Sequence, residues 1–274
     1  MDASFASLRP GPELAGYVTR LHGARLAGGA PQRQLELPVA GTALIVALEH
    51  GWRIGVDERA PLRDHTSFAG GLTLGPAVSE HRGAYDLVEA YLTPAGTTAV
   101  LGVPAAHLAG DVVALDALLG PEAAFLAERL AELRGWRARL TAFASWLDRR
   151  IRERPTPLSP DAAWALRRLD ATGGRVSIGT LQAELRCSGR HLASRFAREV
   201  GTTPKAYAQL VRFGLAAERL RAGEAPAVVA ATCGYADQAH LTRHVRRFGA
   251  TTPARLRSDR APVTDVQDLA PAAA

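Results

Sequence analysis

PAVVAATCGYADQAHLTRHVRRFGATTPARLR, residues 226–257, is the stretch that decides the fold of the C-terminal part of this 274-residue chain. Residues 227–231 are apolar and predict a short helix, which ends before Gly234 because glycine permits the backbone of a tight turn. Asp237 is a typical N-cap for a second helix. The apolar positions of that second helix recur at helical spacing, at Leu241, Val245 and Phe248. The stretch therefore predicts a helix-turn-helix unit.

The opposite face of the second helix is polar and basic. A helix that buries one apolar stripe leaves its other side chains free to enter a DNA groove. Gln238 and Arg243 can each make paired hydrogen bonds to base edges. For His240, packing and capping at the helix start is as good an interpretation as DNA contact. The candidate DNA contacts of this unit are Gln238, His240, Thr242 and Arg243.

The same pattern occurs twice, at a separation of 49 residues. Residues 191–192 align with 240–241, and residues 202–204 align with 251–253. An internal repeat of this kind indicates a duplicated structural unit. We therefore expect two helix-turn-helix units in this part of the chain.

The first unit is predicted to have a leading helix over 178–185 and a second helix over 188–200. Because the neighbouring side chains on the matching face are short, Arg190 is its only long donor, and the second unit is expected to carry more sequence information. A longer helix over 204–221 is predicted to join the units. The candidate DNA contacts of the first unit are Arg190, Ser194 and Arg195.

These residues resemble the DNA-binding domain of the AraC/XylS-type transcriptional regulators, over roughly residues 159–257. The resemblance rests on Gly234 and Tyr235, residues 237–241, Arg243 and residues 252–253, and it is far more specific than a lone helix-turn-helix pattern. It implies an all-α DNA-binding domain over 161–260 with two units joined by a long helix.

The chain departs from the family pattern at two places. Ser194 stands where the family often has a basic residue, and the glycine usually found where Ala250 stands has moved to Gly249. The partner that the resemblance implies is double-stranded DNA. RNA polymerase and a second copy of the chain are further candidate partners.

The charge of the chain is divided unevenly. The net charge is +6, but residues 156–260 carry 17 Lys and Arg against 8 Asp and Glu, whereas the remainder carries 16 against 19. A basic C-terminal part is the charge distribution expected of nucleic-acid binding, although a basic solvated surface would have the same composition.

The cysteine content and the hydropathy pattern indicate a cytoplasmic protein. Cys187 and Cys233 are interpreted as small packing residues, because no disulfide framework or CxxC pair is present. The N-terminus lacks the pattern of a signal peptide, and no apolar run approaches the roughly 20 residues of a membrane span.

The first 115 residues contain short apolar runs separated by turn residues. Strands are predicted over 42–48, 67–74 and 87–92. The turn at residues 49–51, followed by alternating apolar residues over 52–56, predicts a hairpin. Many short strands with glycine turns favour an antiparallel sandwich or a small barrel.

This half resembles the cupin-like sensory domains that precede the DNA-binding domain in one branch of the same family. The resemblance rests on residues 35–38, 92–94, 101–104 and 108–110. It implies a domain over 1–154 that senses a small molecule or mediates association, and it supplies no ligand, so the effector and its pocket residues are unknown. The aromatic residues available to line a pocket are Trp52, Tyr85 and Tyr91, for which core packing is the competing interpretation.

The chain is predicted to be helical from about residue 115. Residues 136–151 carry one apolar stripe, which we interpret as intramolecular core in preference to a dimer contact. The proline-rich residues 155–160 are expected to form the linker between the domains. The tail over 261–274, rich in alanine, proline and acidic residues, is expected to be disordered.

The predicted fold class is α+β with two domains, a cupin-like β domain with a helical segment and an all-α domain with two helix-turn-helix units. No metal site and no cofactor are predicted, because the N-terminal histidines lack the paired His-x-His and following Glu of metal-binding cupins. No cysteine precedes Cys187, which excludes the thiolate chemistry of DNA-repair alkyltransferases. The leading hypothesis is a DNA-binding transcription regulator and not an enzyme. The alternative is a cupin-like enzyme that carries a DNA-binding tail.

Overall fold

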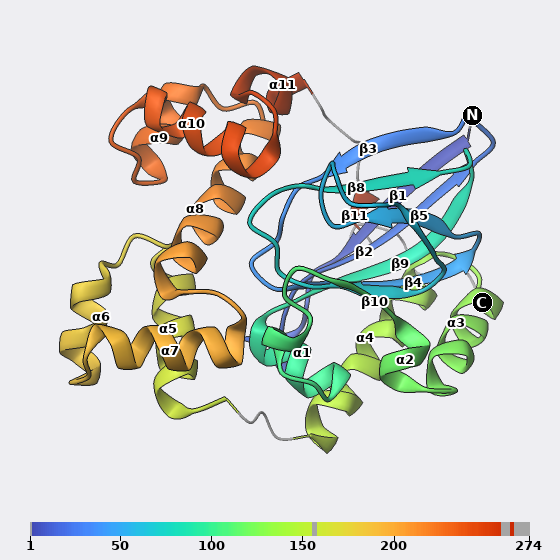
Figure 1. Ribbon diagram of the computed structural model, residues 1–274. Coiled ribbons are helices and arrows are strands. Elements are labelled where there is room, and N and C mark those ends of the chain that lie inside the picture. The colour runs from blue at the N-terminus through green and yellow to red at the C-terminus, as the bar shows by residue number, and fades with distance from the viewer. Residues whose placement is uncertain (1, 155–157, 259–263, 266–274) are drawn as a thin grey trace.

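The computed structural model describes residues 2–154, 158–258 and 264–265. Within these residues the chain has an α+β fold (Figure 1). The N-terminal half contains two β-sheets and the helices that cover one of them (Figure 1). A second group of helices forms the C-terminal half (Figure 1).

The larger sheet has seven strands in the order β10-β7-β4-β9-β2-β1-β11, and its internal pairs are antiparallel except for the short parallel pair of β1 and β11. Its strands are β1 (Asp2–Leu8), β2 (Val18–Ala27), β4 (Thr42–Glu49), β7 (Phe68–Gly70), β9 (Tyr85–Leu92), β10 (Val112–Ala114) and β11 (Thr264–Asp265). The smaller sheet has the order β3-β8-β5-β6 and is antiparallel throughout. Its strands are β3 (Gln32–Glu36), β5 (Trp52–Gly55), β6 (Arg63–His65) and β8 (Ala77–His81).

Strand β9 shows how the larger sheet contributes to two cores. Fully buried residues alternate along it with half-buried ones, because successive side chains of a strand point to opposite faces. Val88 and Ala90 join the core beneath the helices, whereas Tyr85 and Leu87 pack against the small cluster between the sheets. The antiparallel, two-sheet architecture expected from the sequence is therefore present.

The hairpin predicted around residues 49–51 is wrong. His50 turns the chain with a φ of 62°, but β4 pairs with β7 and β9, whereas β5 pairs with β6 and β8. The turn instead carries the chain from one sheet to the other. The strands predicted over 42–48 and 87–92 are present as β4 and β9, at 42–49 and 85–92, whereas the strand predicted over 67–74 is limited to β7 at 68–70.

The helices of the N-terminal half cover the larger sheet on one face. Leu140, Phe143 and Leu147 of α4 are fully buried against it, so the predicted apolar stripe is intramolecular core. The buried guanidinium of Arg150 is bound by Glu122 at 2.8 Å and by the Val100 carbonyl. The helical segments are η1 (Pro12–Leu14), α1 (Pro94–Leu101), η2 (Ala105–His107), α2 (Leu115–Leu119), α3 (Glu122–Glu132) and α4 (Trp136–Glu153).

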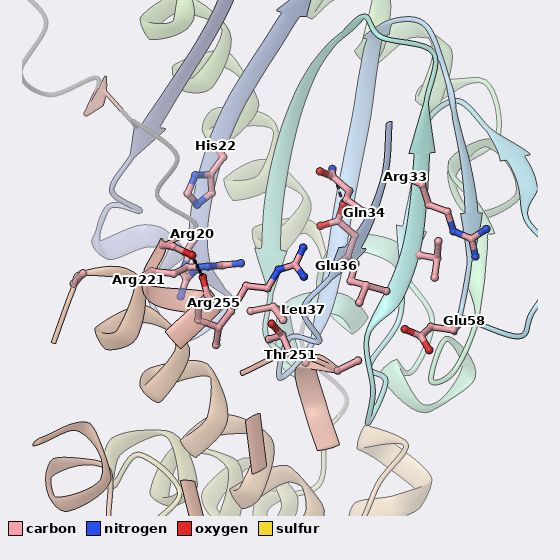
Figure 2. A pocket seen from close by; sticks show the side chains of 17 residues that line it. Arg20, His22, Arg33, Gln34, Glu36, Leu37, Glu58, Arg221, Thr251 and Arg255 are labelled. Atoms are coloured by element: carbon pink, nitrogen blue, oxygen red, sulfur yellow. Dashed lines mark hydrogen bonds between the residues drawn. The ribbon is translucent and has the colours of Figure 1, made fainter. Parts of the chain in front are cut away.

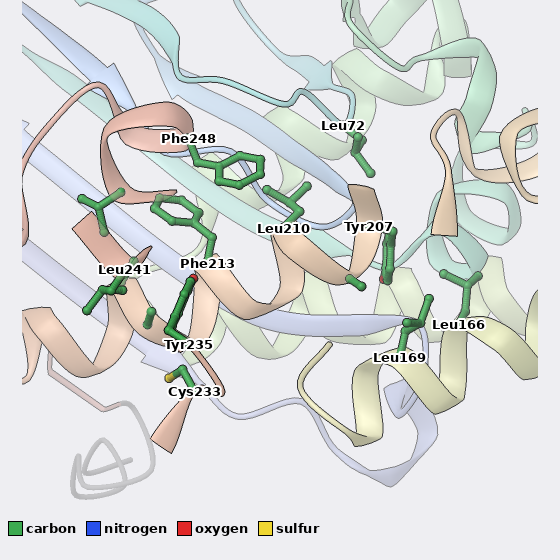
Figure 3. Packing of buried hydrophobic residues seen from close by; sticks show 14 of the residues in the cluster. Leu72, Leu166, Leu169, Tyr207, Leu210, Phe213, Cys233, Tyr235, Leu241 and Phe248 are labelled. Carbon is green, nitrogen blue, oxygen red and sulfur yellow. The ribbon is translucent and has the colours of Figure 1, made fainter. Parts of the chain in front are cut away.

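The C-terminal helices share one core that runs along both sides of the longest helix (Figure 3). Tyr207, Leu210 and Phe213 of that helix are buried between the helices of the two units. The helices are α5 (Pro160–Ala171), α6 (Ile178–Leu185), α7 (Gly189–Val200), α8 (Pro204–Arg221), α9 (Pro226–Thr232), α10 (Gln238–Gly249) and α11 (Pro253–Ser258).

The two halves of the molecule are in direct contact. Leu72 of the N-terminal half belongs to the C-terminal core, and Leu37 and Ala40 pack against it. The Tyr207 hydroxyl lies 3.3 Å from the Ala40 carbonyl oxygen. Arg20 of β2 forms an ion pair with Glu218 of α8. The N-terminal half therefore contacts the helix that joins the two helix-turn-helix units.

The linker and the tail are only partly described. Of the expected linker over 155–160, residues 155–157 lie outside the described residues, and Ser159 caps α5 by accepting a hydrogen bond from the Ala162 amide. Thr264–Asp265 form β11 beside β1, so the expectation of disorder is wrong at these two residues. The rest of the expected disordered tail over 261–274 lies outside the described residues.

Candidate nucleic-acid interface and ligand cavities

The first unit consists of α6 and α7 joined by a tight turn. Arg186 takes the left-handed conformation at the end of α6, with a φ of 50°, and Ser188 caps α7 by accepting a hydrogen bond from the His191 amide. Leu192, Phe196 and Val200 form the buried stripe of α7. The opposite face of α7 remains exposed at Arg190 and Ser194.

The second unit consists of α9 and α10. Gly234 supplies the positive φ of the turn, at 73°, and the Asp237 carboxylate caps α10 by accepting from the His240 amide at 2.6 Å. Leu241, Val245 and Phe248 are fully buried, as their spacing predicted. Gln238 and Arg243 are exposed on the other side of the helix.

Helix α8 fixes the two units relative to each other. It has 18 residues and is therefore about 27 Å long. Helices α5 and α7 pack against its first half, whereas α9, α10 and α11 pack near its C-terminal end (Figure 1). The two second helices, α7 and α10, are thus both packed against α8 (Figure 1).

Three of the seven predicted contacts, Arg195, Thr242 and His240, interact with other residues of the protein in this conformation. Arg195 lies 3.4 Å from the Asp161 carboxylate of α5, and His191 lies 4.0 Å from the same carboxylate. The Thr242 hydroxyl donates to the Gln238 carbonyl one turn earlier. The Arg195 pairing involves a residue 34 positions away in the sequence, so spacing on α7 alone could not reveal it.

His240 packs in an aromatic group on the inner side of α10. Its ring is perpendicular to that of Tyr235, with centroids 5.2 Å apart, and it accepts a hydrogen bond from the Ala236 amide. His244 lies behind it, and burial, reinforced by the charges of His240 and Arg212, lowers the pKa of His244 to about 4. His244 is therefore neutral at physiological pH. The packing interpretation of His240 gains support from these contacts.

A shallow basic hollow lies on the exposed face of α7. It has a volume of about 410 Å³ and is lined by Ser188, Arg190, His191, Ser194, Arg195 and Arg198. Arg198 was not among the predicted contacts. It is spaced by four residues from Ser194 and by eight from Arg190, so the helical repeat of that face could have identified it. On α10, Arg246 extends the exposed basic face in the same way.

A groove separates the N-terminal half from the end of α8 and from α11 (Figure 2). Four arginines line it, with Arg20 and Arg33 from the strands and Arg221 and Arg255 from the helices. The guanidinium of Arg20 is already engaged by Glu218. Arg221 lines the groove from the C-terminal end of α8.

A second cavity, of about 250 Å³, lies between the two sheets. Trp52, Tyr85 and Tyr91, the three aromatic residues singled out in the sequence, all line it. Trp52 and Tyr85 also pack together, with ring centroids 5.6 Å apart. Trp52 and Tyr85 therefore have both roles, since they pack in the small inter-sheet cluster and form a cavity wall, whereas Tyr91 lines the wall without being part of that cluster.

In the part of the chain that the structure describes, no group of three or more His, Cys, Asp or Glu side chains is arranged to hold a metal ion. Among those residues, no helix combines the length and the apolar character needed to cross a bilayer.

Known proteins resemble both the C-terminal helices and the fold of the whole chain. A family model for a helix-turn-helix domain matches residues 181–259. No curated protein matches the sequence. Apo ToxT from Vibrio cholerae has a similar structure, at 8% identity over 88% of this chain and 97% of that chain, with a TM-score of 0.54.

Two further solved structures are similar. ToxT from Vibrio cholerae with a bound unsaturated fatty acid is 10% identical over 90% of this chain and 97% of that chain, with a TM-score of 0.50. A probable AraC family transcriptional regulator from Rhodopseudomonas palustris is 25% identical over 38% of this chain and all of that chain, with a TM-score of 0.35.

Four observations agree on a helix-turn-helix domain in the C-terminal half. They are the repeat, the exposed basic faces of α7 and α10, the family model and the shared two-domain fold. Residues 181–259 are therefore a helix-turn-helix domain, and the chain as a whole shares the fold of ToxT, with an N-terminal β-sheet domain before the helical domain.

Proposed function

We propose that α7 and α10 enter two successive major grooves on one face of the DNA. The observation that carries this proposal is the position of both helices on one rigid helix, α8, with their polar faces exposed. A protein whose reading helices are about one helical turn apart contacts two sites separated by roughly 10 base pairs. A single chain would then read a site of two parts.

The residues of the two units would have different roles. Gln238 and Arg243 are exposed near the start and middle of α10 and carry the paired donors and acceptors that distinguish bases. Arg190 is the long donor at the start of α7, whereas Arg195 is engaged with Asp161. The second unit would therefore supply more of the sequence specificity, and Arg198 and Arg246 would contact phosphates.

The N-terminal half would bind a small-molecule effector and act on DNA binding through its contacts with α8. The ToxT structure with a bound unsaturated fatty acid has the same fold, but at 10% identity the class of ligand has to be argued from the residues of this chain. RNA polymerase and a second copy of the chain remain candidate partners. A regulator of transcription would act inside the cell, where the DNA is found.

The spacing of the operator tests the proposal directly. A site would first be identified by mapping bound DNA genome-wide, and its two halves would then be separated by inserting five or ten base pairs. Five base pairs rotate the second half-site by about half a turn, so α7 and α10 could no longer reach both halves from one face. We expect the five-base-pair insertion to reduce affinity at least to that of a single half-site.

The ten-base-pair insertion controls for rotation, because it restores the face but doubles the distance. It should also fail, since α8 is one helix of fixed length. Undiminished binding to either altered site would exclude the two-groove arrangement. Binding that needs only the half-site read by α10 would restrict recognition to the second unit.

A further inference from the structure

The residues that line the cavity between the two sheets all belong to the N-terminal half. Its walls are built by residues from both sheets, with Ile45 and Glu89 on one side and Trp52 and Ser79 on the other. We propose that this cavity binds a small organic cation, a protonated or quaternary amine on an apolar body. The inference rests on the proposed effector role of this half of the chain and gives that effector its chemical class.

Aromatic side chains form one wall of the cavity. Trp52 and Tyr85 lie with ring centroids 5.6 Å apart and planes inclined at 42°, and Phe68 lies 6.5 Å from Trp52. Tyr91, six residues after Tyr85 on the same face of β9, lines the same cavity. The face of an aromatic ring carries negative charge density and attracts a cation that lies within about 6 Å of the centroid.

Every charged side chain that lines the cavity in the described residues is acidic, namely Glu36, Glu89 and Asp111. The Glu36 carboxylate is held in place by the Ser79 hydroxyl at 2.6 Å and by the Gln34 amide at 3.0 Å. Glu89 points into the cavity from β9 and shares a hydrogen bond with Tyr91. A carboxylate ligand would be repelled here, whereas a cation would be attracted by both glutamates.

The charged and titratable groups around Glu89 favour the same ligand. Burial and the nearby Glu36 raise the pKa of Glu89 to about 7, and Tyr91 and Arg20 only partly oppose this. Arg20 is the one basic group in that set, and its guanidinium is paired with Glu218. Burial, with Arg20, lowers the pKa of His22, beside Tyr91, to about 4. Burial also lowers the pKa of His81. A bound cation would therefore complete the charge balance of a buried carboxylate.

The segment that connects β3 to β4 contacts both the cavity and the DNA-binding half. Leu37, Pro38 and Val39, which connect β3 to β4, form part of its wall. Leu37 packs against the C-terminal core, where it approaches Gly249 at the end of α10. Three residues after Leu37, the Ala40 carbonyl lies 3.3 Å from the Tyr207 hydroxyl of α8. A ligand that orders the segment 37–40 would therefore change the contacts of both α8 and α10.

The test uses three probes with the same aromatic body, measured on the full chain without DNA by calorimetry. Benzyltrimethylammonium carries a fixed positive charge, benzyl alcohol is neutral and phenylacetate is an anion. We expect benzyltrimethylammonium to bind at least tenfold more tightly than the alcohol at pH 8, and phenylacetate to bind more weakly than both. Because no DNA is present, failure here leaves the DNA-binding proposal untouched.

Two further measurements tie the binding to the cavity. Affinity for the quaternary probe should rise at least threefold from pH 6 to pH 8 in the unaltered protein, because Glu89 ionises in that range while the charge of the probe is constant. Glu89→Gln should lower that affinity at least tenfold and remove the pH dependence. Glu132→Gln, which changes an exposed carboxylate on α3, is the matched control and should change neither.

The inference fails if benzyl alcohol or phenylacetate binds as tightly as the cation, or if no probe binds. It also fails if the pH dependence is flat in the unaltered protein, a result that does not depend on the folding of any variant. Equal losses in the Glu89→Gln and Glu132→Gln proteins would place the cation on the general acidic surface of the N-terminal half.

Discussion

Arg243 is the residue on which the proposed base recognition depends most. It is exposed on α10, and none of the ion pairs among the described residues involves it. Arg243→Ala should weaken binding to the preferred site by about 1 to 3 kcal/mol and relax the choice at one base pair. Competition titrations with every base at each position would measure this.

Arg221→Ala is the control for Arg243→Ala, because the Arg221 side chain lines the groove toward the N-terminal half. It should at most weaken binding evenly across DNA sequences. If Arg243→Ala weakened specific and random DNA equally, Arg243 would be a phosphate contact, and no change on either DNA would make it a surface residue without a role in binding.

At the C-terminal end of α10, we expect a substitution to raise stability at Ala250 but not at Gly249. Ala250 has a φ of 48°, a left-handed conformation that glycine adopts without steric strain. Ala250→Gly should therefore raise the free energy of unfolding by about 0.5 to 1 kcal/mol. At Gly249, in contrast, an added methyl group would lie 3.1 Å from Leu37 and 3.4 Å from Phe213. Gly249→Ala should destabilise the protein, and urea unfolding of both variants would test the pair.

The ionisation of Glu89 should make stability depend on pH in a defined direction. Glu89 has a pKa of about 7 in the folded protein and of 4.5 in the unfolded chain. Its contribution to the free energy of unfolding is therefore favourable in acid and is lost as the pH rises through 7. Glu89→Gln should stabilise the protein at pH 8 by up to about 3 kcal/mol, and the gain should disappear by pH 5. Unfolding curves that show the same gain at both pH values would contradict the buried-carboxylate argument.

At the scale of single elements, the features that could be predicted are those decided within a few residues. Asp237 caps α10 and Gly234 supplies the turn before it as predicted, because a carboxylate that accepts from the amide three residues later and a glycine with positive φ both act locally. The partner of a strand is not local, which is why β4 and β5 were wrongly paired. For the same reason, the sequence named Arg195 as a candidate DNA contact but could not identify Asp161 as its partner.

Helix α8 offers a test of rigidity at the same scale. Gly214 lies in its interior, and nothing lies within 4 Å of the position that a Cβ would occupy. Gly214→Ala should raise the free energy of unfolding by about 0.5 to 1 kcal/mol, because alanine loses less backbone entropy in a helix. Spacing preference on DNA should be unchanged or sharper. A broader preference would show that α8 bends at Gly214 when the protein binds.

For the whole molecule, the positive charge needed for DNA binding lies in the C-terminal half, whereas the core of that half also includes residues of the N-terminal half. The positive charge lies in residues 156–260, so all phosphate contacts should come from that part. The core of that part, however, includes Leu72 and is covered by Leu37 and Ala40. A fragment over 158–258 should therefore fold and bind DNA, but with a lower unfolding temperature than the full chain.

The salt dependence of binding separates these two effects. Each phosphate contact contributes a slope of about −0.9 to the logarithmic plot of affinity against salt, whatever else the chain contains. The fragment and the full chain should consequently give parallel plots, with any difference in affinity appearing as a constant offset that reports how the N-terminal half positions α7 and α10. A shallower slope for the fragment would mean that residues before 158 also contact the backbone of the DNA, and the division of charge between the halves would then not describe how the protein binds.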